Sequence, residues 1–522
     1  MPRPSFGVGS SVWSRSGLAL LSSLLVRVAL PTLDVAPAIF IAWVPLLVAS
    51  AASSPRTALL LGLLQGFVLG LFSHAWLVGA LLRNFPTPVW GAVLALVLVA
   101  LLVGLRSALV MSGVSFLRAA SLPVWLSFPV LQVAAEQLIP GAFPWTNALA
   151  VSSTPIWQQA AAFGGSSAVS AWLCLSNGLL AEGWCARRTE LALPRAGSAP
   201  MRLLSAAVLV VSAMTAVGAG LMWAETTRER AAPTIRIAIG HYDSSAQADP
   251  VAELRTLALL EQRSHRAPDL WIWPETMVSS PQTPRQLTRL ANDYLRRDSA
   301  VATNVEPLTG PLLLGAVTEH GGILENSALL FTAGNVSGSY SKHVLMPVGE
   351  TSTLVAGLSL PAASLGRTAP FRPGADSEPL SVSGHPLAIS ICYEDILAGF
   401  IFEQVARSRA ELLVNLTSDR WFKGTSAVAF HFALARLRAV EHRKFLIRST
   451  RDGVSAVIDG TGRVVASLSR HPSAIIAVDA PLLSGLSVAE STHDAVSIAV
   501  PLVAASLLLL GCLLRRRNKA PG

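Results

Sequence analysis

The fold of this chain is decided by one stretch, Leu387-Ala388-Ile389-Ser390-Ile391-Cys392-Tyr393-Glu394-Asp395. Its apolar half predicts a buried strand, and the polar residues after the cysteine predict a turn straight into a helix. A residue at such a corner is exposed and lies beside free backbone N–H groups, which lower the pKa of a thiol and can bind an oxyanion. Cys392 is therefore a candidate nucleophile, and a buried structural cysteine is the alternative from this stretch alone.

Two other apolar runs end in chemically useful side chains. The run Leu270-Trp271-Ile272-Trp273 predicts a strand that leads through Pro274 to Glu275, and Lys342 follows a second predicted strand at Tyr340-Ser341. A carboxylate beside a thiol can take its proton, and a fixed ammonium favours both a thiolate and an oxyanion. Glu275, Lys342 and Cys392 are therefore candidate catalytic residues, each at the end of a predicted strand.

The composition indicates a membrane protein. Of the 522 residues, 52% are hydrophobic and 14% charged, and the mean hydropathy of +0.52 is too high for a soluble protein of this size. The apolar residues are concentrated at 17–223 and 496–514. We expect an N-terminal transmembrane bundle of about seven spans over 1–224, a soluble domain over 225–490, and a last transmembrane helix with a basic tail over 491–522.

Eight apolar stretches are candidate spans, of which the first two are short. They lie near residues 17–30, 38–52, 57–82, 88–111, 122–140, 158–182, 201–223 and 496–514. The net charge of +9 comes largely from arginines beside these stretches, such as Arg187-Arg188 and Arg515-Arg516-Arg517, which is typical of membrane topology and not of nucleic-acid binding. Because basic loops stay in the cytoplasm, both chain ends are expected inside, and the soluble domain is expected outside, in the periplasm of a bacterium.

Four polar residues lie at or near membrane depth: Gln65, His74, Glu136 and Gln137. Polar groups are costly there, so they are either functional or hydrogen-bonded between helices.

In the soluble region, predicted strands alternate with predicted helices from Ile235 onward, which indicates an α/β domain with covered sheets. The other three cysteines lie in or beside apolar stretches, so Cys392 has no disulfide partner within this domain.

The segments around the candidate residues resemble the nitrilase superfamily and, within it, the bacterial apolipoprotein N-acyltransferases. Five segments carry the resemblance in the family's order: Trp273–Glu275, Lys342–Glu350, Ile391–Glu394, His431–Glu441 and Gly453–Asp459. The resemblance spans nearly the whole chain, including the predicted spans around one outer domain. It implies an αββα sandwich carried by a transmembrane bundle at the bacterial inner membrane.

The resemblance also implies roles for individual residues. Glu275 would be the general base, Lys342 the stabiliser of the oxyanion, and Cys392 the acylated nucleophile. Further residues would surround the site: Glu350, Tyr393 and Glu394 near the reacting groups, with Asn326 and Trp421 along the pocket. Glu350 could act by orienting Lys342 through an ion pair, Trp421 is equally consistent with plain core, and Arg438 with Glu441 is expected to be a structural pair. No cofactor or metal is implied.

The implied reaction moves an acyl chain from a phospholipid, through a thioester, to the N-terminal diacylglyceryl-cysteine of an apolipoprotein. The alternatives are a membrane-bound carbon-nitrogen hydrolase with another acceptor and a non-catalytic binding protein. Ser418, Lys423, Arg451 and Asp452 are among the residues that depart from the family pattern. We expect them to line the acceptor pocket and to alter specificity. Residues 351–367 are expected to form a mobile, apolar lid without regular structure, and a packed core connection is the alternative.

Overall fold

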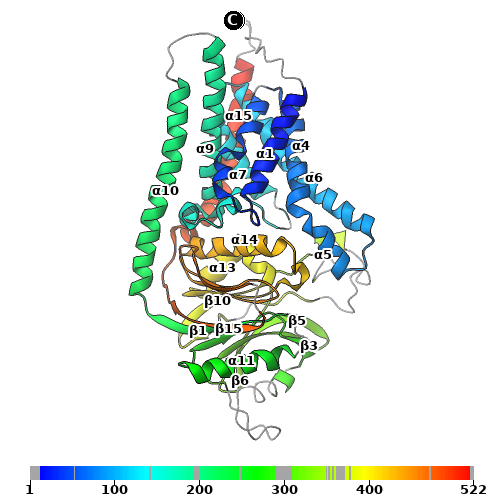
Figure 1. Cartoon of the computed structure of the whole chain (residues 1–522), viewed down its shortest axis with the longest axis vertical. Helices are drawn as coiled ribbons and strands as arrows, with labels where there is room; N and C mark the ends of the chain where they lie inside the picture. The colour runs from blue at the N-terminus through cyan, green and yellow to red at the C-terminus, as the bar shows by residue number, and fades with distance from the viewer. Residues whose placement is uncertain are drawn as a thin grey trace. The chain divides into compact units, whose positions relative to one another are not determined.

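The computed structural model describes residues 12–51, 53–139, 141, 143–192, 199–245, 249–283, 285–287, 289, 308–347, 350, 353–355, 358–359, 371–375, 378–469 and 472–517. The chain falls into two compact units (Figure 1). The first, which is helical, comprises Met1–Leu81, Pro88–Leu221 and Ser491–Gly522. The second, which is α/β, comprises Met222–Glu490 together with the short segment Leu82–Thr87. The end of α5 and the three residues after it therefore belong to the α/β unit.

The helical unit contains short and long helices. They are α1 (Val12–Ala29), η1 (Ala36–Ala38), α2 (Ile39–Ala42), α3 (Val44–Ala51), α4 (Pro55–His74), α5 (Trp76–Asn84), α6 (Val89–Arg118), α7 (Val124–Leu138), η2 (Asn147–Val151), α8 (Pro155–Gln158), α9 (Ala161–Ala192), α10 (Ala199–Ala231) and α15 (Val488–Arg517). The last turns of α5 and α10 and the first residues of α15 belong to the α/β unit.

Fewer helices than predicted are long and apolar enough to cross a membrane. Among the described residues there are four, namely α4, α6, α10 and α15. The expected count of about eight spans is therefore wrong, because other apolar stretches fold as short or interrupted helices. The stretch at 38–52 is divided between α2 and α3, α7 has 15 residues, and α9 contains a kink at Gly164 and Gly165.

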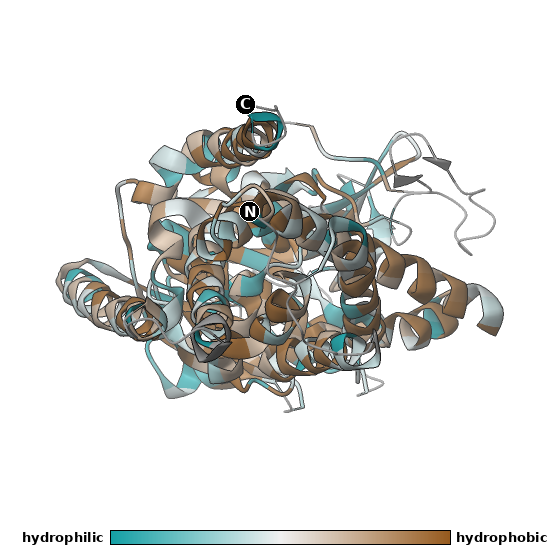
Figure 2. Cartoon of the chain, turned by 90° about the horizontal axis from the view of Figure 1, so that it is seen from above, coloured by the Kyte–Doolittle hydropathy of each residue, from teal (hydrophilic) through white to brown (hydrophobic). Residues whose placement is uncertain are grey.

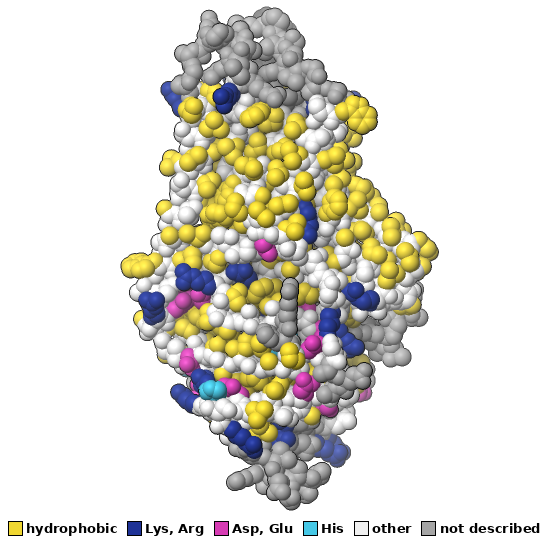
Figure 3. All heavy atoms as spheres, viewed as in Figure 1, with side chains coloured by type: hydrophobic (Ala, Val, Ile, Leu, Met, Phe, Trp, Pro, Cys, Tyr) yellow, Lys and Arg dark blue, Asp and Glu magenta, His cyan; other side chains and the backbone are white. Residues whose placement is uncertain are grey.

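The surface of the helical unit is apolar. Figure 2 shows its helices end on, mostly in the brown of hydrophobic residues, and Figure 3 shows hydrophobic side chains with few charged ones among them. Leu98 on α6, Leu209 on α10 and Leu502 on α15 are 58%, 68% and 61% exposed. An apolar surface of this extent is costly in water and is suited to lipid.

The polar residues at membrane depth are hydrogen-bonded inside the helical unit. The side-chain oxygen of Gln65 accepts from Ser107 at 2.7 Å, and the amide of Gln137 donates to Ser167 at 3.0 Å. Glu136 accepts from the amide of Asn147 at 2.7 Å. These contacts support the structural alternative for the three residues, since a hydrogen bond between helices offsets the cost of placing a polar group in a membrane.

The α/β unit contains two main sheets and three described α-helices of its own. The first sheet has the order β15 (Ala474–Pro481), β1 (Thr234–His241), β2 (Leu270–Ile272), β4 (Leu312–His320), β5 (Ile323–Thr332) and β6 (Asn335–Ser341), with β3 (Val278–Gln282) beside β4. The second has the order β14 (Val464–Leu468), β13 (Ser455–Ile458), β12 (Leu446–Arg451), β11 (Leu412–Ser418), β10 (His385–Ile391) and β9 (Ser381–Val382). The helices are α11 (Pro250–Ser264), α13 (Ala398–Ser408) and α14 (Ala427–His442).

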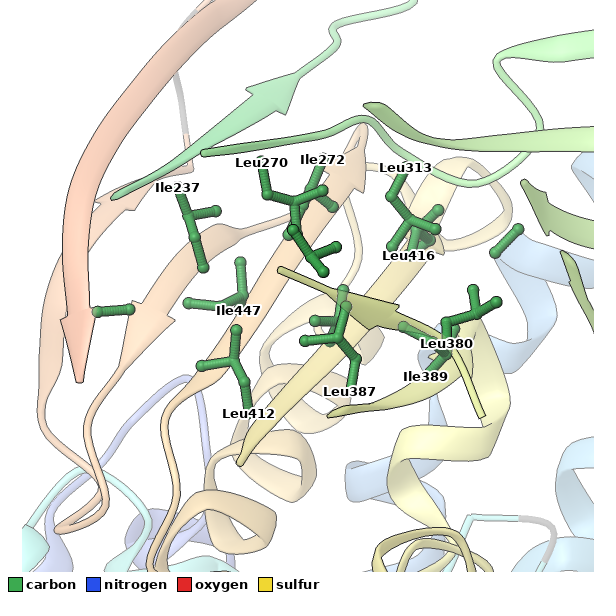
Figure 4. Close-up of a cluster of buried hydrophobic side chains, with 14 of the residues drawn as sticks. Ile237, Leu270, Ile272, Leu313, Leu380, Leu387, Ile389, Leu412, Leu416 and Ile447 are labelled. Atoms are coloured by element: carbon green, nitrogen blue, oxygen red, sulfur yellow. The ribbon is translucent and has the colours of Figure 1, made fainter. Parts of the chain in front are cut away.

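The alternation of side chains along the strands builds four layers. Leu270 and Ile272 of β2 face the second sheet, where they join Leu412 and Ile447 in one buried cluster (Figure 4). Trp271, between them in sequence, faces the opposite way and packs with residues of α11. The outer face of the second sheet packs in the same manner against α13 and α14. Because successive residues of a strand point to opposite faces, this gives the expected nitrilase-like sandwich.

The carboxyl ends of the parallel strands determine where polar side chains collect. Strands β1, β2 and β4 are parallel neighbours, as are β10, β11 and β12. Glu275 lies three residues beyond the end of β2, and Cys392 directly follows β10. In each sheet, therefore, one candidate catalytic residue lies just beyond the carboxyl end of a parallel strand.

One expectation falls mainly on residues outside the described ranges. Of the expected lid over 351–367, the described residues are Thr353–Val355 and Leu358–Ser359, which pair as antiparallel strands β7 and β8. The expectation that this segment lacks regular structure is therefore wrong for these five residues.

Candidate functional site

Glu275 is a buried carboxylate with one oxygen bound and one oxygen available. It is 5% exposed, and its Oε1 accepts from the side-chain amide of Asn326 at 2.7 Å. Its Oε2 has no hydrogen-bond partner among the described residues. Burial raises the pKa of Glu275, and the opposing effects of Lys342 and Asn326 do not cancel the rise. A carboxylate with a raised pKa and a free oxygen is suited to accept a proton.

Lys342 is held as an ammonium by two carboxylates. Its Nζ lies 2.7 Å from Oε2 of Glu350 and 3.7 Å from Oε1 of Glu275, and the side chain is 1% exposed. Burial opposes the charge, but the carboxylates of Glu350 and Glu275 outweigh burial and raise the pKa of Lys342. The sequence analysis suggested that Glu350 orients Lys342 through an ion pair, and this ion pair is present in the structure. The shorter contact to Glu350 leaves Glu275 the less neutralised of the two carboxylates.

Asn326 joins the two carboxylates. Its Nδ2 donates to Oε1 of Glu275 at 2.7 Å and to Oε1 of Glu350 at 3.0 Å. The primary amide has two N–H groups, so both bonds can form together. The backbone carbonyl of Asn326 also accepts from the N–H of Lys342 at 2.8 Å. Asn326 on β5 therefore fixes the spacing of the groups around the ammonium.

Cys392 lies at the corner between β10 and the 3-10 helix η4 (Cys392–Ile396) in an unusual backbone conformation. Its φ of 52° is in the left-handed region, which costs roughly 1–3 kcal/mol for a residue other than glycine. The sulfur lies 4.0 Å from the carbonyl oxygen of Ser418. Such a strained corner persists only where its surroundings hold it, and it directs the side chain away from the path of the strand.

The environment of the thiol differs from the sequence expectation. Cys392 is 7% exposed, and it is the first of five residues of 3-10 helix, not of an α-helix. Burial, with the negative charge of Glu275, raises the pKa of Cys392, whereas Lys342 lowers it. The expectation of an exposed thiol with a lowered pKa is wrong, because burial outweighs the nearby N–H groups. The thiol is neutral at rest and depends on a base for activation.

Glu394 ties the cysteine corner to the lysine strand. Its Oε1 accepts from the N–H groups of His343 and Val344 at 2.6 and 3.0 Å, and its Oε2 accepts from the N–H of Ile391 at 2.7 Å and the hydroxyl of Tyr340 at 2.8 Å. Burial raises the pKa of Glu394 to about 7, because Lys342 and these hydrogen bonds offset only part of its cost. This side chain is fully buried and holds two loops together.

Tyr340 was not predicted from the sequence. It lies two residues before Lys342, and residues two apart on a strand share a face, so its inward direction could have been inferred once Lys342 was chosen. Tyr393, which was predicted near the site, is 9% exposed, and burial raises its pKa.

Trp421 packs against the end of α5 and the residue that follows it. It lies on η5 (Asp419–Phe422), and its ring centroid is 5.3 Å from that of Phe85. Its backbone carbonyl accepts from the side-chain amide of Asn84 at 3.0 Å. Trp421 is half-buried, which excludes the plain-core alternative.

The four departures from the family pattern lie in different surroundings. Lys423 donates to Asp243 at 2.6 Å, to Asp452 at 2.7 Å and to Ser245 at 2.8 Å, which occupies its three N–H groups. Arg451 donates to the backbone carbonyl of Thr276, the residue after Glu275, at 3.3 Å. Of the two cationic side chains, Arg451 therefore reaches the loop of the general-base candidate, while Lys423 joins the loops of Asp243 and Asp452.

The matches to known families agree with this geometry. The model of the apolipoprotein N-acyltransferase N-terminal domain matches residues 22–179, and the model of carbon-nitrogen hydrolases matches residues 236–484. An apolipoprotein N-acyltransferase of Azotobacter vinelandii is 29% identical over 98% of this chain and 97% of its own length. The chain belongs to the apolipoprotein N-acyltransferase family.

Other members of the apolipoprotein N-acyltransferase family are similar over most of the chain. The enzyme of Geobacter metallireducens is 26% identical over 86% of this chain and 85% of its own length. Among solved structures, an amidase of the nitrilase superfamily from Nesterenkonia AN1 is 20% identical, covering 50% of this chain and 94% of its own, with a TM-score of 0.37. A nitrilase-superfamily member from Saccharomyces cerevisiae is 17% identical, covering 51% and 95%, with a TM-score of 0.34.

Proposed function

We propose that this chain is an apolipoprotein N-acyltransferase in which Glu275, Lys342 and Cys392 perform the chemistry. The arrangement that carries the proposal is the buried ammonium of Lys342 between Glu350 and Glu275, beside a neutral thiol at a strained corner. In a buried site, such fixed charges stabilise a developing oxyanion more strongly than they would in solution. The family supplies the substrate class.

The first half-reaction acylates the enzyme. Glu275 takes the proton of the Cys392 thiol, and the thiolate attacks the carbonyl carbon of a phospholipid acyl ester. Lys342 stabilises the tetrahedral oxyanion. The C–O ester bond then breaks, the proton passes from Glu275 to the departing oxygen, and a lysophospholipid leaves behind a thioester.

The second half-reaction transfers the acyl chain. The α-amino group of the diacylglyceryl-cysteine of an apolipoprotein attacks the thioester carbonyl, and Glu275 accepts a proton from the nitrogen. The C–S bond breaks, and the proton returns to the Cys392 sulfur. The product is an amide, and the enzyme is restored. The same site would serve both half-reactions because each passes through an oxyanion next to Lys342.

Membrane orientation follows from the parity of the helices and the position of the arginines. The long apolar helices α4, α6 and α10 precede β1, the first strand of the α/β unit, and α15 follows β15, its last strand. An odd number of crossings before this region separates it from both chain ends. Arg515, Arg516 and Arg517 at the end of α15 favour the cytoplasm for the tail. We therefore place the chain in the inner membrane with residues 225–490 as a periplasmic catalytic domain.

The reaction is tested by mass spectrometry of the intact protein. The purified full-length chain is incubated with phospholipid vesicles, and a mass increase of one acyl group on Cys392 is expected. Addition of a diacylated lipopeptide should remove that mass and yield a triacylated peptide. An acyl-enzyme that is only hydrolysed would favour a carbon-nitrogen hydrolase with another acceptor. Absence of any acyl-enzyme would overturn the proposal.

Arg451 is the departure best placed to affect the acceptor step. Replacement by Asn would remove a positive charge next to the loop of Glu275. We expect unchanged formation of the acyl-enzyme and an altered preference among lipopeptide acceptors, measured by competition between two peptides. Equal preference in both proteins would show that Arg451 does not select the acceptor.

A further inference from the structure

A closed ring of four charged side chains lies directly behind the cysteine corner. His431 of α14 contacts Asp395 of η4 through Nε2 at 2.9 Å and Asp419 of η5 through Nδ1 at 2.7 Å. Arg448 of β12 completes the ring, with Nε 3.4 Å from Asp395 and Nη2 3.4 Å from Asp419. Each of the four side chains is at most 2% exposed.

The geometry requires His431 to be a cation. An ionised carboxylate only accepts hydrogen bonds, so a ring nitrogen facing it must carry a proton. Both nitrogens of His431 face carboxylate oxygens, one each from Asp395 and Asp419. Burial opposes the charge, but the two aspartates outweigh burial and raise the pKa of His431 to about 9, while Arg448 opposes them. The ring then holds two positive and two negative charges.

The ring joins the two loops on either side of the thiol. Asp395 lies three residues after Cys392, within the same turn of 3-10 helix. Asp419 directly follows Ser418, whose carbonyl oxygen lies 4.0 Å from the sulfur. Asp419 and Arg448 also act electrostatically on the thiol. A displacement of either aspartate would thus move a group that borders the nucleophile.

We propose that His431 is a positioning residue, which as an imidazolium draws Asp395 and Asp419 together and so holds the strained Cys392 corner in its reactive orientation. The effect on acyl transfer rests on the function proposed above. His431 does not touch the substrate in this arrangement and acts through the two aspartates. Removing its charge leaves a buried ring with one excess negative charge, which is costly and favours separation of the loops.

Two variants distinguish charge from packing. His431→Gln keeps a polar side chain but leaves Arg448 alone against two carboxylates. The double variant His431→Gln with Asp419→Asn restores neutrality, because one cation then faces one anion. His385→Gln is the matched control, since His385 on β10 also pairs with a carboxylate, Glu411, at 2.6 Å but is partly exposed.

Three measurements are made on each full-length variant: the melting temperature, the rate of alkylation of Cys392 followed by peptide mass spectrometry, and the rate of acyl-enzyme formation from phospholipid vesicles. His431→Gln should slow acylation about a hundredfold, as expected for a misplaced reacting group, and should change the alkylation rate. The double variant should recover most of both rates, and His385→Gln should match the unaltered protein.

The outcomes separate this inference from the proposed reaction. Unaltered rates in His431→Gln, or a folded double variant as slow as the single one, would overturn the positioning role. If the single variant does not fold, a folded and reactive double variant supports the role, and failure of both to fold overturns it. If the unaltered protein forms no acyl-enzyme, the proposed function fails, while alkylation still tests His431.

Discussion

At the scale of single residues, one lysine between two carboxylates separates their chemical roles. Glu350 takes the short contact to Lys342, and that ammonium, despite burial, lowers the pKa of Glu350. Glu275 is farther from the same ammonium, and burial raises its pKa. When environments push two neighbouring pKa values apart, the group with the raised pKa is the better base. The structure thereby distinguishes Glu275 from Glu350 without reference to their order in the chain.

Replacing the reacting groups should abolish acylation and leave the fold intact. We expect no acyl-enzyme in Cys392→Ser, and a loss of roughly a hundredfold or more in Glu275→Gln and in Lys342→Ala, because each removes stabilisation of the transition state. Acyl-enzyme formation is measured by intact mass, and the fold by circular dichroism. Glu403→Gln on the exposed face of α13 is the control. Full activity in any of the three would remove that residue from its role.

Replacing Glu350 by Gln should shift the pH dependence of acylation. The negative charge of Glu350 raises the pKa of Glu275, so its loss lowers that pKa. Glu275 acts as a base only when ionised, and the acid limb of the rate profile should therefore move to lower pH. The maximal rate should fall, because Lys342 loses its nearest carboxylate. Acylation rates between pH 4 and 8 test this, and an acid limb that stays in place or moves upward contradicts it.

The sequence could identify these residues only in part. Glu275, Lys342 and Cys392 could be predicted because each is a reactive side chain that follows an apolar run in the sequence. The bridging role of Asn326 could not be predicted, since its two partners lie 51 and 24 residues away. The pKa of Cys392 was predicted with the wrong sign because burial depends on segments that pack from elsewhere in the chain. The ring around His431 was hidden for the same reason.

At the scale of elements, the short η4 turn depends on one carboxylate. Glu394 accepts four hydrogen bonds, two on each oxygen, from groups on the lysine strand and the cysteine corner. The sequence predicted a helix here from the polar residues after Cys392. The 3-10 geometry arises because Glu394 turns back to bind the N–H of Ile391, and α13 begins only at Ala398. The sequence pattern therefore predicted the end of the strand at Cys392 but not the 3-10 turn that follows it.

Glu394→Gln should loosen this turn. An amide has one accepting oxygen, so two of the four donors would face an NH₂ group, at a cost of roughly 1–3 kcal/mol for each donor left without a partner. We expect a lower melting temperature and slower acylation. Glu403→Gln on the exposed face of α13 is the control. An unchanged melting temperature together with unchanged acylation would show that the turn does not need the carboxylate.

At the scale of the whole molecule, membrane topology depends on parity more than on the number of spans. The sequence overestimated the long helices, because hydropathy does not reveal where Gly164, Gly165 or a short turn interrupts an apolar stretch. The order of strands and helices in the second unit was predicted, since strands covered on both faces read as short continuous apolar runs between polar segments.

Reporter fusions test the orientation. A periplasm-dependent reporter fused after residue 240 should be active, and the same reporter fused at the C-terminus should be inactive, because the basic end of α15 favours the cytoplasm. A cytoplasm-dependent reporter at the same two positions is the control and should give the opposite pattern. An inactive periplasmic reporter after residue 240 would refute the proposed orientation.

The segment Leu82–Thr87 has a consequence for the ancestry of the chain. It belongs to the α/β unit, where Asn84 and Phe85 contact Trp421, although its neighbours on both sides in sequence belong to helices of the other unit. A gene rearrangement that transferred residues 222–490 alone would leave Trp421 without these two partners. Recombination therefore cannot exchange the α/β unit intact as one continuous segment. We expect selection to keep the coding sequence of residues 222–490 together with that of α5 and α6.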